Sequence, residues 1–580
     1  MCFQSLKIYN YKIFKMLSNI KTKILSELKK FDENASIEFS EHCEFTSTTA
    51  FKLAKKQGRN PSLIGKEIAA QISKNLADDV EVKTLNGYLN FYLTDKFYSE
   101  NLPKIPDFKF NKRDEKIILE HTSVNPSGPI HIGRIRNAII GDYIGRILKF
   151  CNYETEIHYY VNDMGKQIAI IALARDKNLK KELSGLSDFI KNFVRNDYEI
   201  LPHYIAGNEY YEIDEEFKNQ VDEIIRKAES GDKDAINLMK ETAKFCLDGQ
   251  IQALENIDIK FDKFDYESEF VENGKVNEVI NHLCPDRKDN EPAEIDLEEY
   301  GIKREKGKII IARSNGTSVY LTRDIAYHLY KINLINKFGS GKILNVLGED
   351  HKQEFLELKT ILNKKFNVTN ISMSAIFFSF VNFEGKKFST RKGNIITIDE
   401  LTNDAIEKAK GIMLEKNFAT EGYKDIGIGA VKYAILKIDP QKQINFKLED
   451  ALNFEGETAC YIQYAYARIC RLIEKSNISE NEIKNFGISY QNVDDAELNL
   501  ARNLIKFYDI AEKAGNEFRP NLLAFYIYNL ATLFSKFYDK CPVLNAEEDV
   551  KKRRLLLVVL VKFVLKNGLN LLGIKTIERM

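Results

Sequence analysis

The sequence predicts an α/β protein, with an open parallel sheet in the middle of the chain, a small α+β module before it and an all-helical domain after it. Three patterns predict this order. Apolar and polar residues alternate over 82–93, apolar runs separated by helical patterns are typical of βα units from about residue 114, and helical spacing takes over from about residue 450. A chain of 580 residues has room for roughly three or four domains.

The composition limits the possible partners and compartments. Lys and Arg total 85, as do Asp and Glu, so a nucleic-acid partner would need a local basic patch. The eight cysteines are scattered without a CxxC pair or zinc spacing, which favours reduced thiols in a cytoplasmic protein and predicts no metal site. The apolar run 555–561 is far shorter than the roughly 20 residues of a membrane span, so we expect no membrane association.

The N-terminal α+β module is expected to span residues 1–105. Its first 15 residues are basic, and Met16 could be the true start; a targeting peptide is the alternative, although no small-residue cleavage pattern follows. The alternating stretch predicts a hairpin that turns at Asn86-Gly87. The stretch 103–113, with two prolines and four cations, is interpreted as a linker.

The parallel α/β domain is expected over residues 106–449. A polar segment with helical spacing and alternating charge, residues 176–255, is interpreted as an insertion packed on the outside of the sheet. Residues 450–580 are expected to form a helical bundle with strongly apolar faces. Strand-like runs within the α/β domain lie at 117–120, 155–161, 308–312, 318–321, 343–347 and 374–381.

The most informative stretch runs from Glu120 to Arg134 and is called the signature loop below. It follows an apolar strand and leads into a helical pattern that begins near Ile132. Strand, Pro/Gly-containing loop and helix form the arrangement by which an open parallel sheet presents a nucleotide to a helix N-terminus. The stretch also carries a carboxylate, an amide and an imidazole, a concentration that packing alone does not explain.

The helix after the signature loop has a stripe of small residues: Gly133, Asn137 and Gly141 recur every fourth residue. Taken alone, this stripe is more typical of close packing than of a nucleotide base on the backbone. His131 before the helix and two cations in its first turn, Arg134 and Arg136, favour a ligand, because unpaired cations there cost roughly 0.3–1 kcal/mol each. An anion would reverse that cost, so we predict a phosphate site.

A second cationic loop covers residues 385–394 and begins shortly after the strand pattern that ends at Val381. A run of lysines and arginines is usually a solvated face. Here glycines bracket the run, which indicates a mobile loop that clamps polyphosphate in a transition state. Since the chain has no Walker A motif, these two loops would have to bind the phosphates.

Together the two loops resemble the HIGH and KMSKS signatures of class I aminoacyl-tRNA synthetases. The resemblance extends to the arginyl-tRNA synthetase family in its archaeal-type form and spans residues 16–580. It rests on motifs in the family's order: Glu-His-Thr-Ser-x-Asn-Pro at 120–126, Tyr-Tyr-Val-Asn-Asp-Met-Gly-Lys-Gln at 159–167, Tyr-Leu-Thr-Arg-Asp at 320–324, the 387–394 loop, Tyr-Ile-Gln-Tyr-Ala-Tyr-Ala-Arg-Ile at 461–469 and the ending Glu-Arg-Met at 578–580. It implies a Rossmann-like catalytic domain, an N-terminal module that contacts the tRNA elbow and a helical anticodon-binding domain.

The resemblance also implies an arginine pocket. The α-amino group would be bound by Glu120, Ser123 and Asn125, the guanidinium by Glu267, Tyr320 and Asp324, and His351 would line the pocket. Two fixed carboxylates can satisfy the planar guanidinium fork, which the lysine ammonium cannot match. A substrate without the fork would leave buried carboxylates unpaired, so we expect no editing domain and hypothesise that the insertion only positions RNA.

For the nucleotide, the resemblance assigns ATP, with Mg²⁺ accompanying it. His131 and Lys387 would stabilise charge on the phosphates, and Gly133 would pack under the adenine. Arg134 stands where HIGH has its second histidine. The resemblance therefore implies that Arg134 is one of the catalytic residues, but it does not imply what Arg134 does. The remaining ATP contacts implied are Asn137, Ser389 and Arg391.

For RNA, the aromatic helix near residue 461 has two readings: ordinary core and surface aromatics, or side chains that stack on unpaired bases. The resemblance implies tRNA(Arg) contacts from Tyr461, Gln463, Arg468 and Met580. The predicted function is an ATP-dependent arginine–tRNA ligase that acts as a monomer, with L-arginine activated in the presence of tRNA. Two alternatives remain: another class I synthetase, such as the cysteine enzyme, and a non-catalytic RNA-binding descendant.

Overall fold

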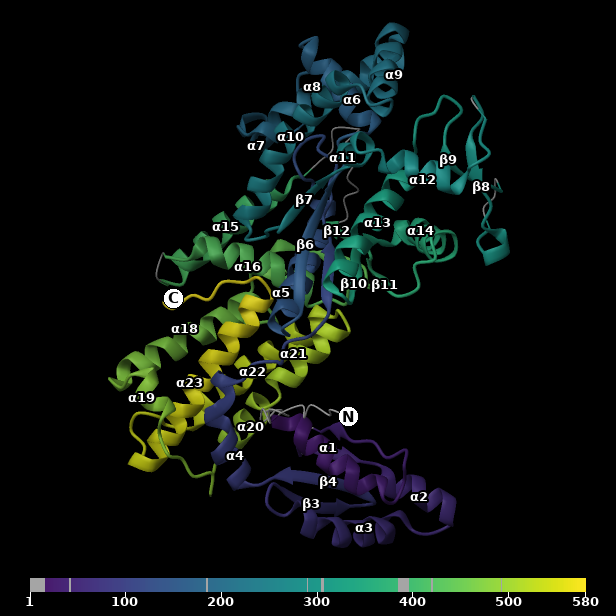
Figure 1. Cartoon of the computed structure of the whole chain (residues 1–580). Helices are drawn as coiled ribbons and strands as arrows, with labels where there is room; N and C mark the ends of the chain where they lie inside the picture. The colour runs from purple at the N-terminus through teal and green to yellow at the C-terminus, as the bar shows by residue number, and fades with distance from the viewer. Residues whose placement is uncertain are drawn as a thin grey trace, which may run out of the picture.

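A computed structural model describes residues 16–40, 43–183, 186–288, 290–303, 307–383, 396–418, 421–491 and 493–580. Figure 1 shows an elongated molecule with the N-terminal module at one end, the parallel sheet near the middle and the helices of the insertion at the other end. The C-terminal bundle lies between the N-terminal module and the sheet. Within the described residues no helix is long and apolar enough to cross a membrane.

The N-terminal module is a four-stranded antiparallel sheet, in the order β1-β2-β4-β3, covered by helices. The predicted hairpin is confirmed: Leu85 pairs with Tyr88, and Asn86 and Gly87 have φ values of 52° and 93°, as a two-residue type I′ turn requires. The elements are α1 (Met16–Lys29), β1 (Glu38–Phe39), β2 (Phe45–Ser47), α2 (Thr49–Gln57), α3 (Pro61–Leu76), β3 (Val80–Leu85), β4 (Tyr88–Leu93) and α4 (Asp95–Asn101).

The stretch predicted as a linker is not a free connection. Residues Leu102–Asp107 form a 3₁₀ helix, η1, in which Leu102 and Ile105 are fully buried. The Tyr508 hydroxyl, from the C-terminal bundle, donates to the Ile105 carbonyl at 2.8 Å. The prolines therefore shape a packed corner instead of a flexible tether.

The five-stranded sheet confirms the open parallel arrangement, with strand order β11-β10-β5-β6-β7 and parallel pairing throughout. Its first strand in the chain, β5, pairs with both β10 and β6, so the strand order reverses direction at β5 and β10. Ligands bind at the carboxyl ends of strands at such a switch point. The strands are β5 (Lys116–Glu120), β6 (Glu154–Val161), β7 (Lys263–Tyr266), β10 (Gly341–Gly348) and β11 (Ser372–Phe378).

Two helices cover opposite faces of the sheet. Ile117 and Leu119 of β5 belong to the same core cluster as α5 (Ile135–Phe150), whereas Ile118 belongs to the cluster of α13 (Tyr320–Phe338). This alternation follows from the two-residue period of a strand. Both helices therefore begin near the carboxyl end of β5, where the signature loop lies.

One strand prediction for this domain is confirmed and one was wrong. The run 308–312 forms β9 (Ile309–Ala312), which pairs with β8 (Ala293–Ile295) in an antiparallel sheet separate from the parallel one. The run 318–321 is not a strand, because α13 begins at Tyr320 and Ser318 forms only an isolated bridge. Glu229 accepts hydrogen bonds from both the backbone and the hydroxyl of Ser318, a distant contact that local pattern does not reveal.

The insertion is helical, as predicted, and stacks on α6 (Lys166–Asp176) (Figure 1). Its last helix also returns to the sheet: Leu247 and Leu254 share the core cluster of β5 and α5. The helices are α7 (Asp188–Asn192), α8 (Asn196–Ile213), α9 (Glu215–Glu229) and α10 (Lys233–Asn256).

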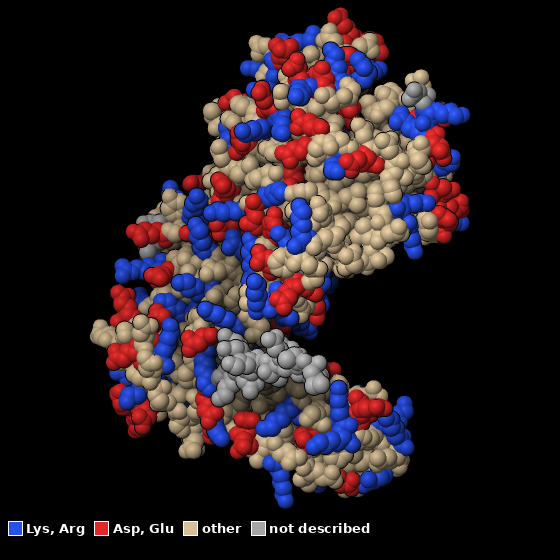
Figure 2. All heavy atoms as spheres, in the orientation of Figure 1, with Lys and Arg blue, Asp and Glu red and all other residues tan. Residues whose placement is uncertain are grey.

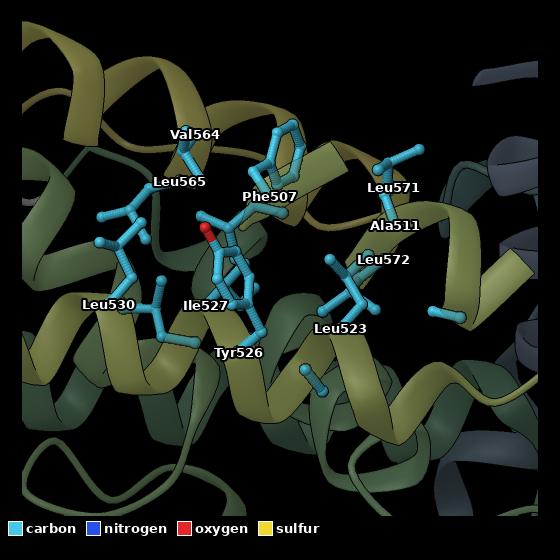
Figure 3. Close-up of a cluster of buried hydrophobic side chains, with 14 of the residues drawn as sticks. Phe507, Ala511, Leu523, Tyr526, Ile527, Leu530, Val564, Leu565, Leu571 and Leu572 are labelled. Carbon is cyan, nitrogen blue, oxygen red and sulfur yellow. The ribbon is translucent and has the colours of Figure 1, made fainter. Parts of the chain in front are cut away.

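The C-terminal region is a helical bundle whose interior is mainly apolar, with a buried ion pair between Glu497 and Arg553 among the exceptions. Figure 3 shows side chains from three of its helices, among them Phe507, Ile527 and Leu565, meeting in one cluster. The helices are α18 (Ala459–Ser476), α19 (Glu480–Lys484), α20 (Asp495–Leu504), α21 (Phe507–Asn516), α22 (Pro520–Lys540) and α23 (Glu548–Leu571). The N-terminal module docks on this bundle through an ion pair of 2.8 Å between Glu44 and Arg502.

Smaller elements connect these parts: η2 (Ile132–Arg134), α11 (Glu267–Glu272), α12 (Lys275–Leu283), η3 (Glu298–Tyr300), η4 (Glu349–His351), α14 (Lys352–Lys365), β12 (Val381–Phe383), α15 (Ile398–Glu415), α16 (Tyr423–Leu436), β13 (Ile444–Phe446) and α17 (Leu448–Ala451). All seven cysteines within the described ranges are unpaired thiols, as the scattered spacing predicted. Figure 2 shows cations and anions interspersed over the face in view, in keeping with the balanced composition.

Candidate active site

The signature loop leaves β5 in a strained conformation. Thr122 and Ser123 have φ values of 70° and 41°, in the left-handed region that residues other than glycine rarely adopt. The Thr122 backbone N–H donates to Asn137 Oδ1 at 3.0 Å, which fixes the loop to the first turns of α5. Such strain persists only where surrounding contacts hold it, and it clusters at functional sites.

His131 caps the short helix η2 and presents one ring nitrogen as a donor. Its Nδ1 accepts from the Gly133 backbone N–H at 3.1 Å, so the remaining nitrogen, Nε2, carries the ring proton. Burial, with a smaller contribution from the Arg134 charge, lowers the pKa of His131 to about 4. At neutral pH the residue is therefore an uncharged donor, and the cation beside it is the exposed Arg134.

The glycines of the small-residue stripe have two different environments, one of close packing and one beside the candidate site. A Cβ on Gly141 would lie 2.1 Å from the His121 ring, so close packing explains that glycine. A Cβ on Gly133 would lie 2.9 Å from the imidazole of His131, which ties that glycine to the candidate catalytic residue. Arg136, read from sequence as a helix-start cation for phosphate, is fully buried and donates to the backbone carbonyls of Ser379 and Asp439.

The second cationic loop lies outside the described residues, and so do its predicted ATP contacts Lys387, Ser389 and Arg391. Its C-terminal flank is described. Ile396 accepts from the Ile132 N–H at 2.9 Å, and the Ile398 N–H donates to Ile130 at 2.9 Å. The segment that follows the loop is thus hydrogen-bonded to the backbone on both sides of His131.

Glu120 ends β5 inside a polar network. Its Oε2 accepts from Lys331 Nζ and from Asn345 Nδ2, both at 2.7 Å. Its Oε1 has only a long contact of 3.4 Å with the Ser123 hydroxyl. The third predicted amino-group ligand, Asn125, is exposed and donates to Gln167 Oε1 at 3.1 Å.

Glu267 begins α11 and is fully buried. Its Oε1 lies 3.2 Å from Arg323 Nε and accepts from the Tyr160 hydroxyl at 3.3 Å, while its Oε2 has no hydrogen-bond partner among the described residues. Burial raises the pKa of Glu267 to about 7, although Arg323 pulls in the opposite direction. A buried carboxylate with an unused oxygen is suited to a cationic ligand that brings its own donors.

The helix α13 carries the other two predicted guanidinium ligands one turn apart. Burial acts to raise the pKa of Asp324, but the contacts with His328 and the charge of Lys331 outweigh it, so the net pKa is lowered. Tyr320 is 45% exposed, yet loss of hydration and the charges of Asp324, Glu120 and Glu267 raise the pKa of its phenol. The charges of Glu120, Glu267 and Asp324 therefore all act on Tyr320, so the three carboxylates and the phenol predicted to bind arginine lie close enough to interact.

His351 follows β10, the strand beside β5. It is 38% exposed, and its Nδ1 lies 2.6 Å from Glu354. That hydrogen bond raises the pKa of His351, which also responds to the charge of Arg134. His351 thus interacts electrostatically both with Asp324 and with Arg134 at the end of the signature loop.

The sequence reasoning missed four residues that complete this network: Lys331, His328, Arg323 and Asn345. The first three share α13 with Tyr320 and Asp324, and the spacing 320, 324, 328 and 331 places four polar side chains on one helix face. That periodicity was available as a signal. Asn345 was not, because its role follows from the register of β10 against β5, in which Asn345 stands opposite Glu120.

The residues predicted to contact RNA occupy different environments. Gln463 is fully buried, and its amide donates to two backbone carbonyls, one of them in the C-terminal segment. Tyr461 and Met580 are half-buried, and Arg468 lies 4.2 Å from the ring centroid of Tyr538. Any effect of Gln463 on RNA binding would thus be indirect, through the C-terminal segment that its hydrogen bond holds in place.

Comparison with known proteins identifies the family. The description "tRNA synthetases class I (R), catalytic domain" matches residues 101–448, "Arginyl tRNA synthetase N terminal domain" matches residues 16–93 and "DALR anticodon binding domain" matches residues 462–580. The chain belongs to the arginyl-tRNA synthetase family. It is thus a class I aminoacyl-tRNA synthetase, and the predicted family, fold class and enzyme class are confirmed.

Relatives named arginine–tRNA ligase match over nearly the whole chain. The protein from Methanocaldococcus jannaschii is 37% identical, covering 95% of this chain and 96% of its own, and that from Archaeoglobus fulgidus is 35% identical over 96% and 98%. Among solved structures, the arginyl-tRNA synthetase of Thermus thermophilus has a TM-score of 0.78 at 24% identity, covering 97% of this chain and all of that one. The latter similarity shows the shared fold. The family match sets aside the cysteine enzyme as an alternative.

Proposed function

We propose that this family member activates L-arginine with ATP and transfers the arginyl group to the 3′-terminal ribose of tRNA(Arg). The observation that carries the proposal is the pairing of two sites at one switch point. Ionisable groups suited to a guanidinium and an amino group surround α13, and an uncharged histidine donor stands at the adjacent helix start. Both reactants of the activation step would meet at the carboxyl ends of β5 and β10.

In the first step, a carboxylate oxygen of arginine attacks the α-phosphorus of ATP, and the bond to the bridging oxygen breaks as pyrophosphate leaves. His131 Nε2–H and Lys387 would donate to phosphate oxygens on which charge accumulates. In the second step, a terminal ribose hydroxyl attacks the arginyl carbonyl and AMP leaves. Glu120, Ser123 and Asn125 would hold the amino group, and Gly133 would leave space for adenine.

The guanidinium subsite accounts for selectivity. Glu267 offers an unused buried oxygen, and Asp324 offers a carboxylate held ionised by its neighbours. Arginine can satisfy both with a planar fork, whereas lysine presents a compact ammonium. Leaving a buried carboxylate unpaired costs enough to reject lysine by about 10⁴-fold, so no editing activity is proposed for the insertion.

The remaining assignments are parts of the same proposal. Among the described residues no cluster of three acidic, histidine or cysteine side chains is placed to hold a metal ion, so Mg²⁺ would enter with the ATP phosphates. The C-terminal bundle, through Tyr461, Arg468 and Met580, and the N-terminal module would contact tRNA(Arg). The protein would act as a cytoplasmic monomer, with domains at 1–105, 106–449 and 450–580.

The test is tRNA-dependent exchange between ATP and pyrophosphate with arginine, lysine and cysteine in parallel. Exchange that depends on arginine and tRNA(Arg), with lysine and cysteine at background, is the expected result. Exchange with none of the three would overturn the catalytic proposal and favour a non-catalytic RNA-binding descendant. Deacylation of mischarged tRNA by the purified protein would overturn the absence of editing.

A further inference from the structure

We propose that Lys331 is a positioning residue for the substrate's α-amino group: it holds one oxygen of Glu120 so that the other is free to bind the amino group. The inference rests on the proposed function, because it deepens the site assigned there to arginine. Lys331 lies on α13 with a fully buried side chain, on the same helix face as Tyr320, Asp324 and His328. Its contacts carry the argument.

The ammonium of Lys331 has a partner for each of its three N–H groups. Nζ lies 2.7 Å from Glu120 Oε2, 3.1 Å from His328 Nε2 and 4.1 Å from the ring centroid of Tyr327. A lysine ammonium has three donors and no acceptor, so this arrangement is complete. Lys331 therefore has no N–H left for a ligand, and its effect on a substrate must pass through Glu120.

The orientation of His328 follows from the same contacts. Its Nδ1 lies 2.9 Å from Asp324 Oδ1 and 3.0 Å from the Asp324 carbonyl, both acceptors, whereas the nearer neighbour of its Nε2 is the Lys331 ammonium, a donor at 3.1 Å, with Asn345 Oδ1 farther away at 3.5 Å. The ring therefore donates at Nδ1 and accepts at Nε2. A continuous chain of contacts runs from Asp324, a candidate guanidinium ligand, through His328 and Lys331 to Glu120, a candidate amino-group ligand.

The two oxygens of Glu120 are used unequally. Oε2 accepts from both Lys331 and Asn345 at 2.7 Å, while Oε1 has only the 3.4 Å contact with Ser123 in the part of the chain that the structure describes. The carboxylate is held on one side and has accepting capacity on the other. A protonated α-amino group brings three donors and a charge, so it suits the free oxygen.

The charge balance agrees with this division. Glu120, Glu267, Asp324 and the buried Glu229 supply four carboxylates, and Arg323 and Lys331 supply two cations that pair with three of them. Within the described residues Asp324 has no Lys or Arg side chain paired with it, so the cluster has carboxylate capacity left for the cationic groups of arginine. Loss of Lys331 would leave the buried Glu120 with the Asn345 amide as its remaining short contact among the described residues, so the carboxylate would no longer be held on one side by a cation.

The test compares two ligands by calorimetry on the full-length protein: L-arginine and 5-guanidinopentanoate, which lacks only the α-amino group. In the Lys331→Met variant we expect the dissociation constant for arginine to rise about 10- to 100-fold, the effect of losing a charged hydrogen bond, and that for the analogue to change less than about threefold. The preference of the native protein for arginine over the analogue would therefore disappear. Equal losses for both ligands, or no loss for arginine, would overturn the proposal.

Two further variants make each outcome interpretable. Lys432→Met removes another buried lysine, on α16, and should lower stability without changing the preference between the ligands. If Lys331→Met does not fold, Glu120→Gln combined with Lys331→Met removes both charges of the pair and should fold while still failing to prefer arginine; a retained preference would contradict the inference. If the native protein binds neither ligand, the proposed function itself fails.

Discussion

Arg195 and Asp399 form a buried bidentate ion pair that joins the insertion to the segment following the second cationic loop. Arg195 Nη1 lies 2.9 Å from Asp399 Oδ1, and Nη2 lies 2.6 Å from Oδ2. The same guanidinium makes two further bonds to Asp197, and all three side chains are less than a tenth exposed. Because the neighbouring backbone at 396–398 is hydrogen-bonded to both sides of His131, this pair supports the C-terminal part of the signature loop.

Replacing Arg195 with Ala should therefore lower both stability and activity. Breaking a buried pair leaves uncompensated carboxylates and costs about 3–5 kcal/mol. We expect a loss of that size in urea unfolding and a reduced kcat for pyrophosphate exchange. The control is Arg226→Ala, which removes an exposed pair with Glu223 and should leave stability nearly unchanged, because solvent screens the pair. Equal effects of the two substitutions would show that Arg195 has no special role.

The glycine beside His131 offers a test of ring placement. In Gly133→Ala the new Cβ would lie 2.9 Å from the imidazole, so the ring must move, and we expect kcat for exchange to fall by about tenfold or more. Gly411→Ala is the matched control, since no atom lies within 4 Å of its added Cβ, and it should be as active as the native protein. Full activity of Gly133→Ala would mean that the imidazole position tolerates the shift.

The loop lysine predicted from sequence is tested by Lys387→Ala. Losing one donor to the transition state should lower the rate of arginine activation by about 10²–10³, with little change in arginine affinity. Lys408→Ala, at an exposed pair with Glu449, serves as the control and should leave the rate unchanged. A near-normal rate for Lys387→Ala would show that the loop does not stabilise the phosphates.

Arginine binding should weaken as the pH falls through 7. Burial raises the pKa of Glu267 to about 7, so the free protein carries a protonated, uncharged Glu267 below that value. Arginine requires the ionised form, and calorimetry without ATP should show affinity falling by about tenfold per pH unit well below pH 7. Glu267→Gln should bind weakly at every pH, and His351→Gln should retain the pH dependence. A flat profile for the native protein would contradict the raised pKa.

The same shift has a consequence for folding. The pKa of Glu267 in the folded protein lies above its ordinary value of 4.5, so the folded state binds this proton more tightly than the unfolded chain does. The contribution of Glu267 to stability is therefore most favourable below pH 4.5 and is lost as the pH rises towards 7. Bound arginine should offset this loss, because its guanidinium pairs with the ionised Glu267. We therefore expect arginine to raise the thermal unfolding temperature more at pH 8 than at pH 6.

Sequence reasoning singled out the signature loop as a candidate site because its chemistry is local. Glu120, His131 and Gly133 lie within fifteen residues. The strand, the Pro/Gly-containing loop and the helix start can each be predicted from residues that are adjacent in the sequence. The hairpin at Asn86-Gly87 could also be predicted from sequence, because the two residues of the turn determine the turn type. By contrast, the run 318–321 reads as a strand, yet a glutamate from α9 holds Ser318 and a helix begins at Tyr320.

By itself, the sequence determined the parallel α/β class, the signature loop and the family resemblance, since these depend on residue order and short-range periodicity. Only the tertiary structure decided which oppositely charged side chains form ion pairs. Lys331 meets Glu120 across 211 residues, and Arg195 meets Asp399 across 204. Such pairs follow from strand register and helix packing, which bring distant residues together in a buried environment where an unpaired charge is costly.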